Sequence, residues 1–275
     1  MFSPYYAFAR RRANADPLDH CAVNVALYGP RGSQWALTER GKSAVGRSDT
    51  TLRIGPSALV WNGATLTMRI DEITAPLPSR INGVVRLHAN YCNDRSWTLD
   101  ADGHHRWRPI APLATVEVDL SQPRLRWSGS GYLDTNWGDS PLADAFVRWD
   151  WSRASLPDGR AAVLYETTAR GAPVAPLFLQ FGARGDVREL PVPPPVALQS
   201  TRWGVARATR AERGDAHVLR TLEDTPFYAR SLLSTRLLDS SVTAVHESLS
   251  LDRFASRWVQ MLLPFRMPRA FGARR

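Results

Sequence analysis

Residues 65–71 read TLTMRID, so that every second side chain is apolar, and residues 116–120 (VEVDL) repeat this period. Successive side chains of a β-strand point to opposite faces, and the pattern therefore predicts half-buried strands. Further runs of this kind occur at residues 82–88, 162–167, 177–181, 203–207 and 242–251, with turn signals at 62–63, 102–103, 158–159 and 185–186. Strands joined by tight turns predict an antiparallel all-β protein, either a sandwich or a barrel.

Two local signals interrupt the strand pattern. Ser3 followed by Pro4 is typical of a helix N-terminus and predicts a short helix over residues 5–12. Residues 190–195 read LPVPPP, a segment that favours an extended conformation and lacks most backbone donors. We therefore predict an N-terminal domain at 1–190, which carries the functional pocket, a Pro-rich linker at 191–196, and a smaller C-terminal β domain at 197–275 that packs against the first.

The composition is that of an ordinary globular protein. The chain has 275 residues, of which 44% are hydrophobic and 22% are charged, and these values exclude a disordered chain or a coiled coil. The net charge of +9 comes almost wholly from arginine, because Lys42 is the only lysine. Positive charge attracts nucleic-acid phosphates and anionic lipids alike, and it therefore does not choose between these partners.

Common site motifs are missing from the sequence. Cys21 and Cys92 have no metal-ligand spacing, the six histidines are scattered, and no nucleotide-binding loop or nucleophile elbow occurs. We therefore expect neither a metal nor a bound cofactor. The arginines at 10–12 are not followed by an apolar segment, and residues 258–265 are too short to span a bilayer. These features predict a cytoplasmic protein without a signal peptide, at most peripherally bound to a membrane.

One segment concentrates unusual side chains, with five of the ten tryptophans between positions 107 and 151. On strands, His105 and Trp107 would share one face, as would Tyr132 and Asp134. If both faces point inward, an imidazole, an indole, a phenol and a carboxyl line one apolar cavity. The alternative is an ordinary aromatic core in which Asp134 caps a turn. A buried aspartate tends to be neutralised, and a neutral carboxyl group is a proton donor.

Long blocks in both halves of the chain match one family pattern in the same order. In the first half they are residues 2–6 (FSPYY), 20–28 (HCAVNVALY), 38–40 (TER), 54–57 (IGPS), 108–112 (RPIAP), 131–134 (GYLD) and 149–154 (WDWSRA). In the second half they are residues 222–230 (LEDTPFYAR), 245–254 (VHESLSLDRF) and 263–269 (LPFRMPR). On these blocks the sequence resembles the carotenoid 1,2-hydratases, also called hydroxyneurosporene synthases. Family members usually carry a strand and more before the first block, a departure that predicts a late start or a missing first strand.

The resemblance implies a hydro-lyase, a carbon–oxygen lyase that adds water across the terminal C1–C2 double bond of acyclic carotenoids such as neurosporene and lycopene, without a cofactor. It also implies two packed lipocalin-like antiparallel β-barrels, the N-terminal one larger. Asp134 is then the proton donor, Trp107 and Tyr132 stabilise the carbocation, and His105 either orients Asp134 or accepts a proton from water. The expected location is the cytoplasmic side of the inner, photosynthetic membrane, whose anionic surface would meet the arginines at 10–12 and 266–275.

Other functions remain open from sequence alone. A lipocalin-like carrier could hold a carotenoid without converting it, although a carrier gains nothing from a buried acid. The same scaffold could cyclise or isomerise a terpenoid. A nucleic-acid-binding barrel would fit the charge, but no recognised module is present, and we expect no nucleic-acid partner. His246, Glu247, Tyr228 and Arg230 match the family pattern, yet domain packing explains them equally well.

Overall fold

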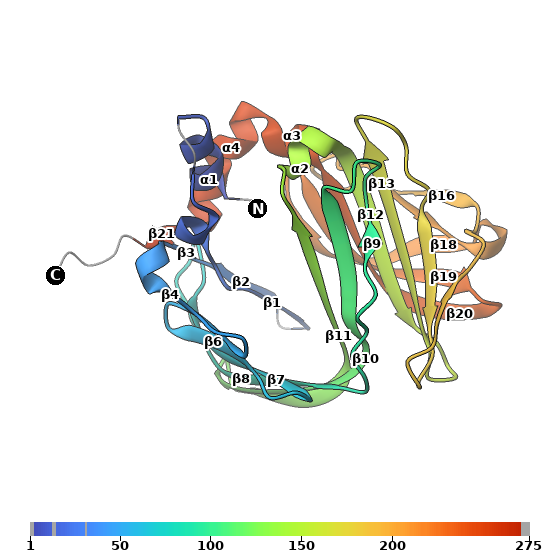
Figure 1. Ribbon diagram of the computed structural model, residues 1–275, viewed down its shortest axis with the longest axis horizontal. Coiled ribbons are helices and arrows are strands. Elements are labelled where there is room, and N and C mark those ends of the chain that lie inside the picture. The colour runs from blue at the N-terminus through green and yellow to red at the C-terminus, as the bar shows by residue number, and fades with distance from the viewer. Residues whose placement is uncertain (1–2, 13–14, 31, 271–275) are drawn as a thin grey trace. The chain divides into compact units, whose positions relative to one another are not determined.

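The computed structural model describes residues 3–12, 15–30 and 32–270, and Figure 1 shows its elements. Nearly all strand pairs are antiparallel, and the expected all-β class is confirmed. The chain divides into two compact units: residues 1–89, 114–131 and 260–275 form the first, and residues 90–113 and 132–259 form the second. Strands β10 (His105–Gln122) and β11 (Leu125–Gly138) each contribute residues to both units.

The first unit is built from the meander that the alternating sequence predicted. Residues 65–71 lie in β7, residues 82–88 in β8, and residues 116–120 in β10. Its core includes Ile70, Val118 and Leu120, which are apolar members of the alternation, and also Ile81 at the start of β8. The strands of this unit, besides its parts of β10 and β11, are β1 (Asn24–Gly29), β2 (Gly32–Leu37), β3 (Glu39–Arg40), β4 (Val45–Arg47), β5 (Thr51–Ile54), β6 (Ser57–Trp61), β7 (Thr65–Ile73), β8 (Arg80–Ala89) and β21 (Arg269–Ala270).

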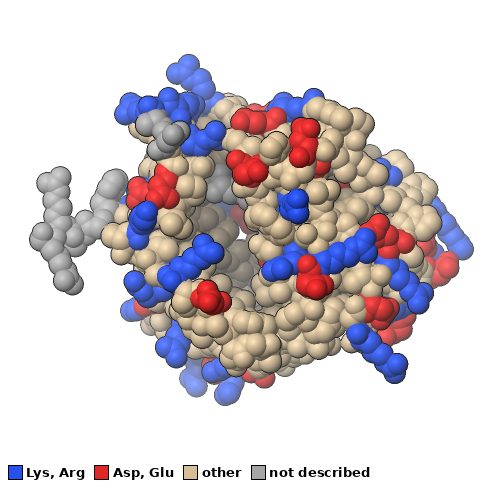
Figure 2. All heavy atoms as spheres, in the orientation of Figure 1, with Lys and Arg blue, Asp and Glu red and all other residues tan. Residues whose placement is uncertain are grey.

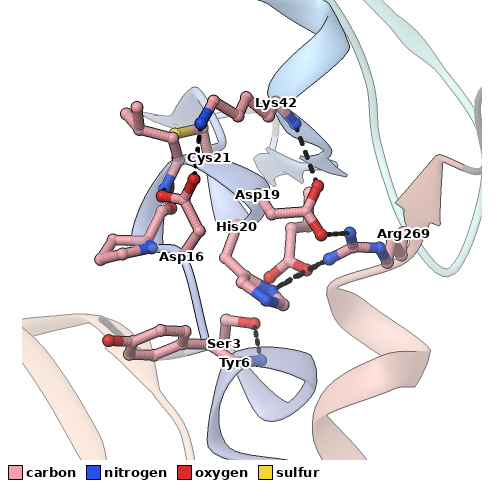
Figure 3. Close-up of polar contacts among 11 residues, drawn as sticks. Ser3, Tyr6, Asp16, Asp19, His20, Cys21, Lys42 and Arg269 are labelled. Atoms are coloured by element: carbon pink, nitrogen blue, oxygen red, sulfur yellow. Dashed lines mark hydrogen bonds and ion pairs between the residues drawn. The ribbon is translucent and has the colours of Figure 1, made fainter. Parts of the chain in front are cut away.

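Charged side chains join the two ends of the first unit's sequence (Figure 3). Strand β21 pairs in parallel with β3, and Arg269 contacts Asp19 at 3.0 Å and also the carboxylate of Glu39. Glu39 is only 1% exposed and lies 2.9 Å from His20 Nδ1. A buried carboxylate requires such a partner, so Arg269 is needed where Glu39 is buried.

The second unit contains a sheet with the strand order β15-β14-β13-β12-β20-β19-β18. Its core includes Ala154, Leu164, Phe178, Leu237 and Ala244. The remaining strands of this unit are β9 (Trp97–Thr98), β12 (Phe146–Ser155), β13 (Ala161–Ala169), β14 (Leu177–Phe181), β15 (Val187–Glu189), β16 (Pro195–Leu198), β17 (Arg207–Arg210), β18 (Ala216–Asp224), β19 (Tyr228–Leu237) and β20 (Ser240–Ser250).

The division of the chain differs from the one expected at residues 191–196. Strand β12 pairs with β20 from Arg148↔Ser250 to Ala154↔Ala244, so one sheet includes strands from both sides of the Pro-rich segment. That segment leads directly into β16, which pairs with β17. The predicted strand at 203–207 is also wrong, because residues 202–203 form a turn and β17 begins only at Arg207. Local composition marks an extended segment, but long-range strand pairing decides which residues belong together.

Helices are few and short in the described residues. The expected N-terminal helix is confirmed as α1 (Pro4–Arg10), with the Ser3 side chain accepting a hydrogen bond from Tyr6 N. The others are α2 (Leu142–Ala145), α3 (Leu251–Ala255) and α4 (Arg257–Arg266), with 3₁₀ turns at Pro17–His20, Lys42–Ala44 and Glu212–Gly214. Within residues 3–12, 15–30 and 32–270, no helix has the length and apolar character needed to cross a bilayer.

Candidate active site

Asp134 is held by two aromatic side chains inside the second unit. Trp107 Nε1 donates a 2.8 Å hydrogen bond to Asp134 Oδ2, and the Tyr132 hydroxyl donates a 3.0 Å hydrogen bond to the same oxygen. Trp107 comes from β10 and is fully buried, whereas Tyr132 and Asp134 lie two positions apart on one face of β11. Both donors are bound to Oδ2, so Oδ1 is the oxygen on which a proton would reside.

The surroundings favour the protonated form of this carboxyl group. Burial raises the pKa of Asp134, and the negative charge of Glu247 raises it further. The hydrogen bonds from Trp107 and Tyr132 act in the opposite direction, because they stabilise the carboxylate. The same burial raises the pKa of the Tyr132 hydroxyl well above its ordinary value. Asp134 is thus a weaker acid than an exposed aspartic acid, and its carboxylate form still accepts hydrogen bonds from Trp107 and Tyr132.

Two further aromatic rings pack against the rings of Trp107 and Tyr132. The Trp107 ring lies 5.2 Å from that of Tyr165, and the Tyr132 ring lies 5.3 Å from that of Trp151. The Tyr165 hydroxyl donates a 3.1 Å hydrogen bond to Asn136 Oδ1, the next residue on the Asp134 face of β11. These contacts form an apolar region with negative ring faces, which can stabilise a carbocation.

Sequence reasoning missed the residues that the second unit's sheet contributes. Tyr165, Trp151, Glu247 and Arg230 are successive cross-strand neighbours on β13, β12, β20 and β19, and their side chains therefore share one face of the sheet. Arg230 Nη2 lies 2.7 Å from Glu247 Oε1. Trp151 had stood out from the sequence as part of an aromatic block, and Glu247 and Arg230 only as members of family blocks without a role. The four residues come from distant segments, and nothing local in the sequence shows that they lie side by side.

His105 is not bound to Asp134, contrary to its expected orienting role. Its Nδ1 lies 3.1 Å from Asp100 Oδ2, and its Nε2 lies 3.0 Å from the carbonyl oxygen of Ser140. Burial opposes ionisation of Asp100, but hydrogen bonds from the backbone and ring of His105 lower the pKa of that carboxyl. The shared face of His105 and Trp107 is present, since both are buried in β10. The imidazole, however, faces acceptors that belong to the loops at the ends of β10 and β11.

A second buried polar cluster lies on the other face of the sheet. Ser248 donates to Asp150 Oδ1, and His246 Nε2 donates at 2.8 Å to the carbonyl oxygen of Ala208. Burial raises the pKa of Asp150 to about 6 and lowers that of His246 to about 4. A hydrolytic triad needs the serine to bind the histidine, and here it binds the aspartate instead. The cluster instead ties β17 to the sheet, and a small pocket lies beside it.

The fold and this site define an antiparallel β protein built around a half-buried acid among aromatic rings. The family model described as carotenoid hydratase CrtC matches residues 1–275, and the chain belongs to this family. The resemblance found in the sequence blocks is therefore confirmed.

Related proteins match over nearly the full chain. An acyclic carotenoid 1,2-hydratase from Thiocapsa roseopersicina is 57% identical over 99% of this chain and 67% of its own length. Proteins of the same description from Rubrivivax gelatinosus and Cereibacter sphaeroides are 44% and 38% identical, over 98% and 99% of this chain and 67% and 96% of their own lengths.

A solved structure supports the fold alone. The crystal structure of an AttH protein from Nitrosomonas europaea is similar with a TM-score of 0.56 and 14% sequence identity, over 82% of this chain and 80% of that one. At this identity the likeness concerns the arrangement of strands and not the chemistry.

Proposed function

We propose that this chain adds water across the terminal C1–C2 double bond of an acyclic carotenoid such as neurosporene or lycopene. The observation that carries the proposal is the Asp134 carboxyl group, whose Oδ2 accepts hydrogen bonds from Trp107 and Tyr132 while burial raises its pKa. A trisubstituted alkene is a weak base, and its hydration must begin with a proton from an acid aimed at C2.

Asp134 donates this proton from Oδ1 and leaves a tertiary cation at C1. The two hydrogen bonds at Oδ2 then stabilise the new carboxylate, and they make the acid stronger than burial alone would allow. The ring faces of Trp107 and Tyr132 stabilise the cation, with Trp151 and Tyr165 in the same aromatic cluster. Each desolvated cation–π contact contributes on the order of 1 to 2 kcal/mol. Water then forms the C1–O bond.

The reaction is redox neutral, since a proton and a hydroxyl group are added to one double bond. Its class is a hydro-lyase, and it needs neither electron transfer nor an activated group, which is why the proposal includes no cofactor. His105 has no direct part in it, because its ring nitrogens are bound to Asp100 and Ser140.

A membrane is the source of such a substrate, and helix α4 suits its surface. Trp258, Met261, Leu262 and Phe265 follow the i, i+3, i+4, i+7 spacing of one helix face, and all four are exposed. Arg257 and Arg266 lie at the two ends of the helix, where they can meet anionic headgroups. We propose peripheral binding to the inner, photosynthetic membrane through this face. Of the expected C-terminal contact at 266–275, residues 271–275 lie outside the described residues.

Nucleic acid remains a poorer partner. On the face drawn in Figure 2, basic side chains lie interspersed with acidic ones and do not form one continuous stripe.

The deciding experiment incubates the purified protein with lycopene in liposomes, without added cofactors, in water labelled with ¹⁸O. A product with labelled oxygen at C1 supports the hydratase. Bound but unchanged lycopene would identify a carrier, a rearranged hydrocarbon would identify an isomerase or cyclase, and oxygen derived from O₂ would identify an oxygenase.

A further inference from the structure

We propose that Glu247, paired with Arg230, is the base that accepts a proton from the water molecule added at C1. This inference rests on the proposed hydration and assigns its second half, the removal of a proton from the water that adds at C1.

The first argument is position. Glu247 and Trp151 are directly opposite each other in the β12–β20 pair, and residues so paired have Cβ atoms about 4.5 to 5.5 Å apart on one face. The Trp151 ring contacts the Tyr132 ring, and the Tyr132 hydroxyl binds Asp134. A chain of direct neighbours therefore connects the two carboxyl groups. Their charges also interact, because Glu247 raises the pKa of Asp134 and of Tyr165.

The second argument is the contrast between the two acids. Asp134 accepts hydrogen bonds from two neutral donors, and burial raises its pKa. Glu247 instead accepts hydrogen bonds from the guanidinium of Arg230, with Nε at 2.9 Å and Nη2 at 2.7 Å from Oε1. One carboxyl group with neutral donors and one paired with a guanidinium are suited to act as acid and base in one reaction.

The third argument is an unused donor between them. Trp151 Nε1 is buried, and within the part of the chain that the structure describes it has no hydrogen-bond acceptor. A buried N–H without an acceptor is costly, and it identifies a place where a polar atom is expected to bind. A water oxygen that accepts from Trp151 Nε1 could donate one of its protons to Glu247.

The complete step balances as follows. The O–H bond of Asp134 breaks and a C2–H bond forms, leaving the Asp134 carboxylate and a cation at C1. A lone pair of the water oxygen forms the C1–O bond, and one O–H bond of that water breaks as its proton passes to Glu247. Glu247 then releases this proton to solvent, and Asp134 takes up another.

The test compares Glu247→Gln with Asp134→Asn in heavy water, with deuterium measured both in the product and in the recovered lycopene. Without the base, the cation still forms but returns a proton to Asp134, so the recovered lycopene gains deuterium. We expect Glu247→Gln to lower the hydration rate about 100-fold or more while this exchange continues. Asp134→Asn should lose both reactions. Glu223→Gln is the matched control, because Glu223 is the other neighbour of Arg230 in the sheet, and it should hydrate within about twofold of the wild type.

Hydration by Glu247→Gln within about threefold of the wild type would overturn the role of Glu247. A folded Glu247→Gln that loses exchange as well as hydration would also overturn it, because the residue would then serve protonation. If this variant does not fold, Glu247→Asp keeps the charge beside Arg230 but shortens the reach, and it should slow hydration and retain exchange. If Glu247→Asp hydrates lycopene as fast as the wild type, or loses deuterium exchange, the role of Glu247 as the base is again contradicted. A wild-type protein that hydrates no acyclic carotenoid contradicts the proposed function itself.

Discussion

Trp107 Nε1 and Asp134 Oδ2 are joined by a 2.8 Å hydrogen bond across 27 positions of the sequence. The indole can only donate, and in the proposed hydration it would therefore stabilise the carboxylate that remains after proton transfer. Its ring at the same time forms part of the aromatic surface on which a cation would lie. In the proposed reaction, one side chain would thus stabilise both the carboxylate and the carbocation that protonation creates.

Asp134→Asn should abolish hydration and leave the fold and lycopene binding intact. The amide keeps the shape of the carboxyl group and can accept the hydrogen bonds of Trp107 and Tyr132, but it has no acidic proton. The rate should fall at least about 100-fold. Product analysis measures the reaction, and circular dichroism with lycopene binding serves as the control. Turnover near the wild-type rate would remove Asp134 from the mechanism.

Tyr132→Phe and Trp107→Ala should differ in kind. The first keeps the ring and loses one of the two donors to Asp134, so it should slow hydration about tenfold and change thermal stability little. The second empties a fully buried site and should lower the free energy of unfolding by about 3 to 5 kcal/mol besides slowing the reaction. Trp127→Ala is the control, because Trp127 is 48% exposed. A Tyr132→Phe variant as inactive as Asp134→Asn would show that the phenol is essential.

His105→Ala should affect stability more than catalysis. The imidazole links Asp100 and Ser140, and the loss of a buried hydrogen bond to a charged group costs about 1.5 to 3 kcal/mol. We expect a lower free energy of unfolding by this amount, partly shared with Asp100→Ala in a double-mutant cycle, and a rate per folded molecule within about threefold of the wild type. A well-folded His105→Ala variant without activity would show that His105 takes part in the reaction.

Asp150 should make stability depend on pH in the acid range. Its folded pKa of about 6 lies above the ordinary 3.8, so the native state holds the proton more tightly than the unfolded chain does. The contribution of this group to the free energy of unfolding is therefore highest below pH 4 and decreases by about 3 kcal/mol as pH rises through 6. Asp150→Asn should remove this decrease in urea titrations between pH 4 and 7.

His246 gives the opposite slope in the same experiment. Its folded pKa of about 4 lies below the ordinary 6.5, so its contribution is lost as pH falls from 6.5 toward 4. In Asp150→Asn, the free energy of unfolding should therefore decrease only as the pH falls, because the contribution of His246 remains. An unchanged pH profile in that variant would contradict the strongly raised pKa of Asp150.

Met261→Ser combined with Phe265→Ser should weaken binding to liposomes at least about tenfold, because these two side chains are the most exposed large apolar groups of α4, at 74% and 71%. Vesicle co-sedimentation at low and high salt measures the effect, with Leu77→Ser, also highly exposed, as the control. Binding that the double variant leaves unchanged but salt abolishes would assign the contact to arginines instead.

The fold was largely predictable because alternation is a local signal. Residues 65–71, 116–120 and 177–181 lie in strands, and Ser3 caps the helix that it predicted. The division of the chain was not predictable, because the pairing of β12 with β20 depends on complementarity between distant segments. A proline-rich run changes local conformation without deciding which strands pair on either side of it.

The candidate site was predictable in part for the same reason. The i, i+2 spacing placed Tyr132 beside Asp134, and the neighbouring strands β10 and β11 brought Trp107 to them. The spacing also placed His105 on the Trp107 face, but Asp100, in the turn before β10, competes for the imidazole. Glu247 was recognisable only as part of a sequence block, since its relation to Asp134 arises from the order of strands in the sheet.

The contact between Glu39 and Arg269 also determines when, during synthesis of the chain, Glu39 can be paired. During synthesis Glu39 emerges 230 residues before its partner, a delay of roughly 10 to 50 s at the usual rates of translation. Throughout that interval a carboxylate that is 1% exposed in the finished protein has no guanidinium to compensate it. Strand β3 therefore lacks this partner until Arg269 has been made, and a ribosome that stalls before Arg269 holds a nascent chain without this ion pair.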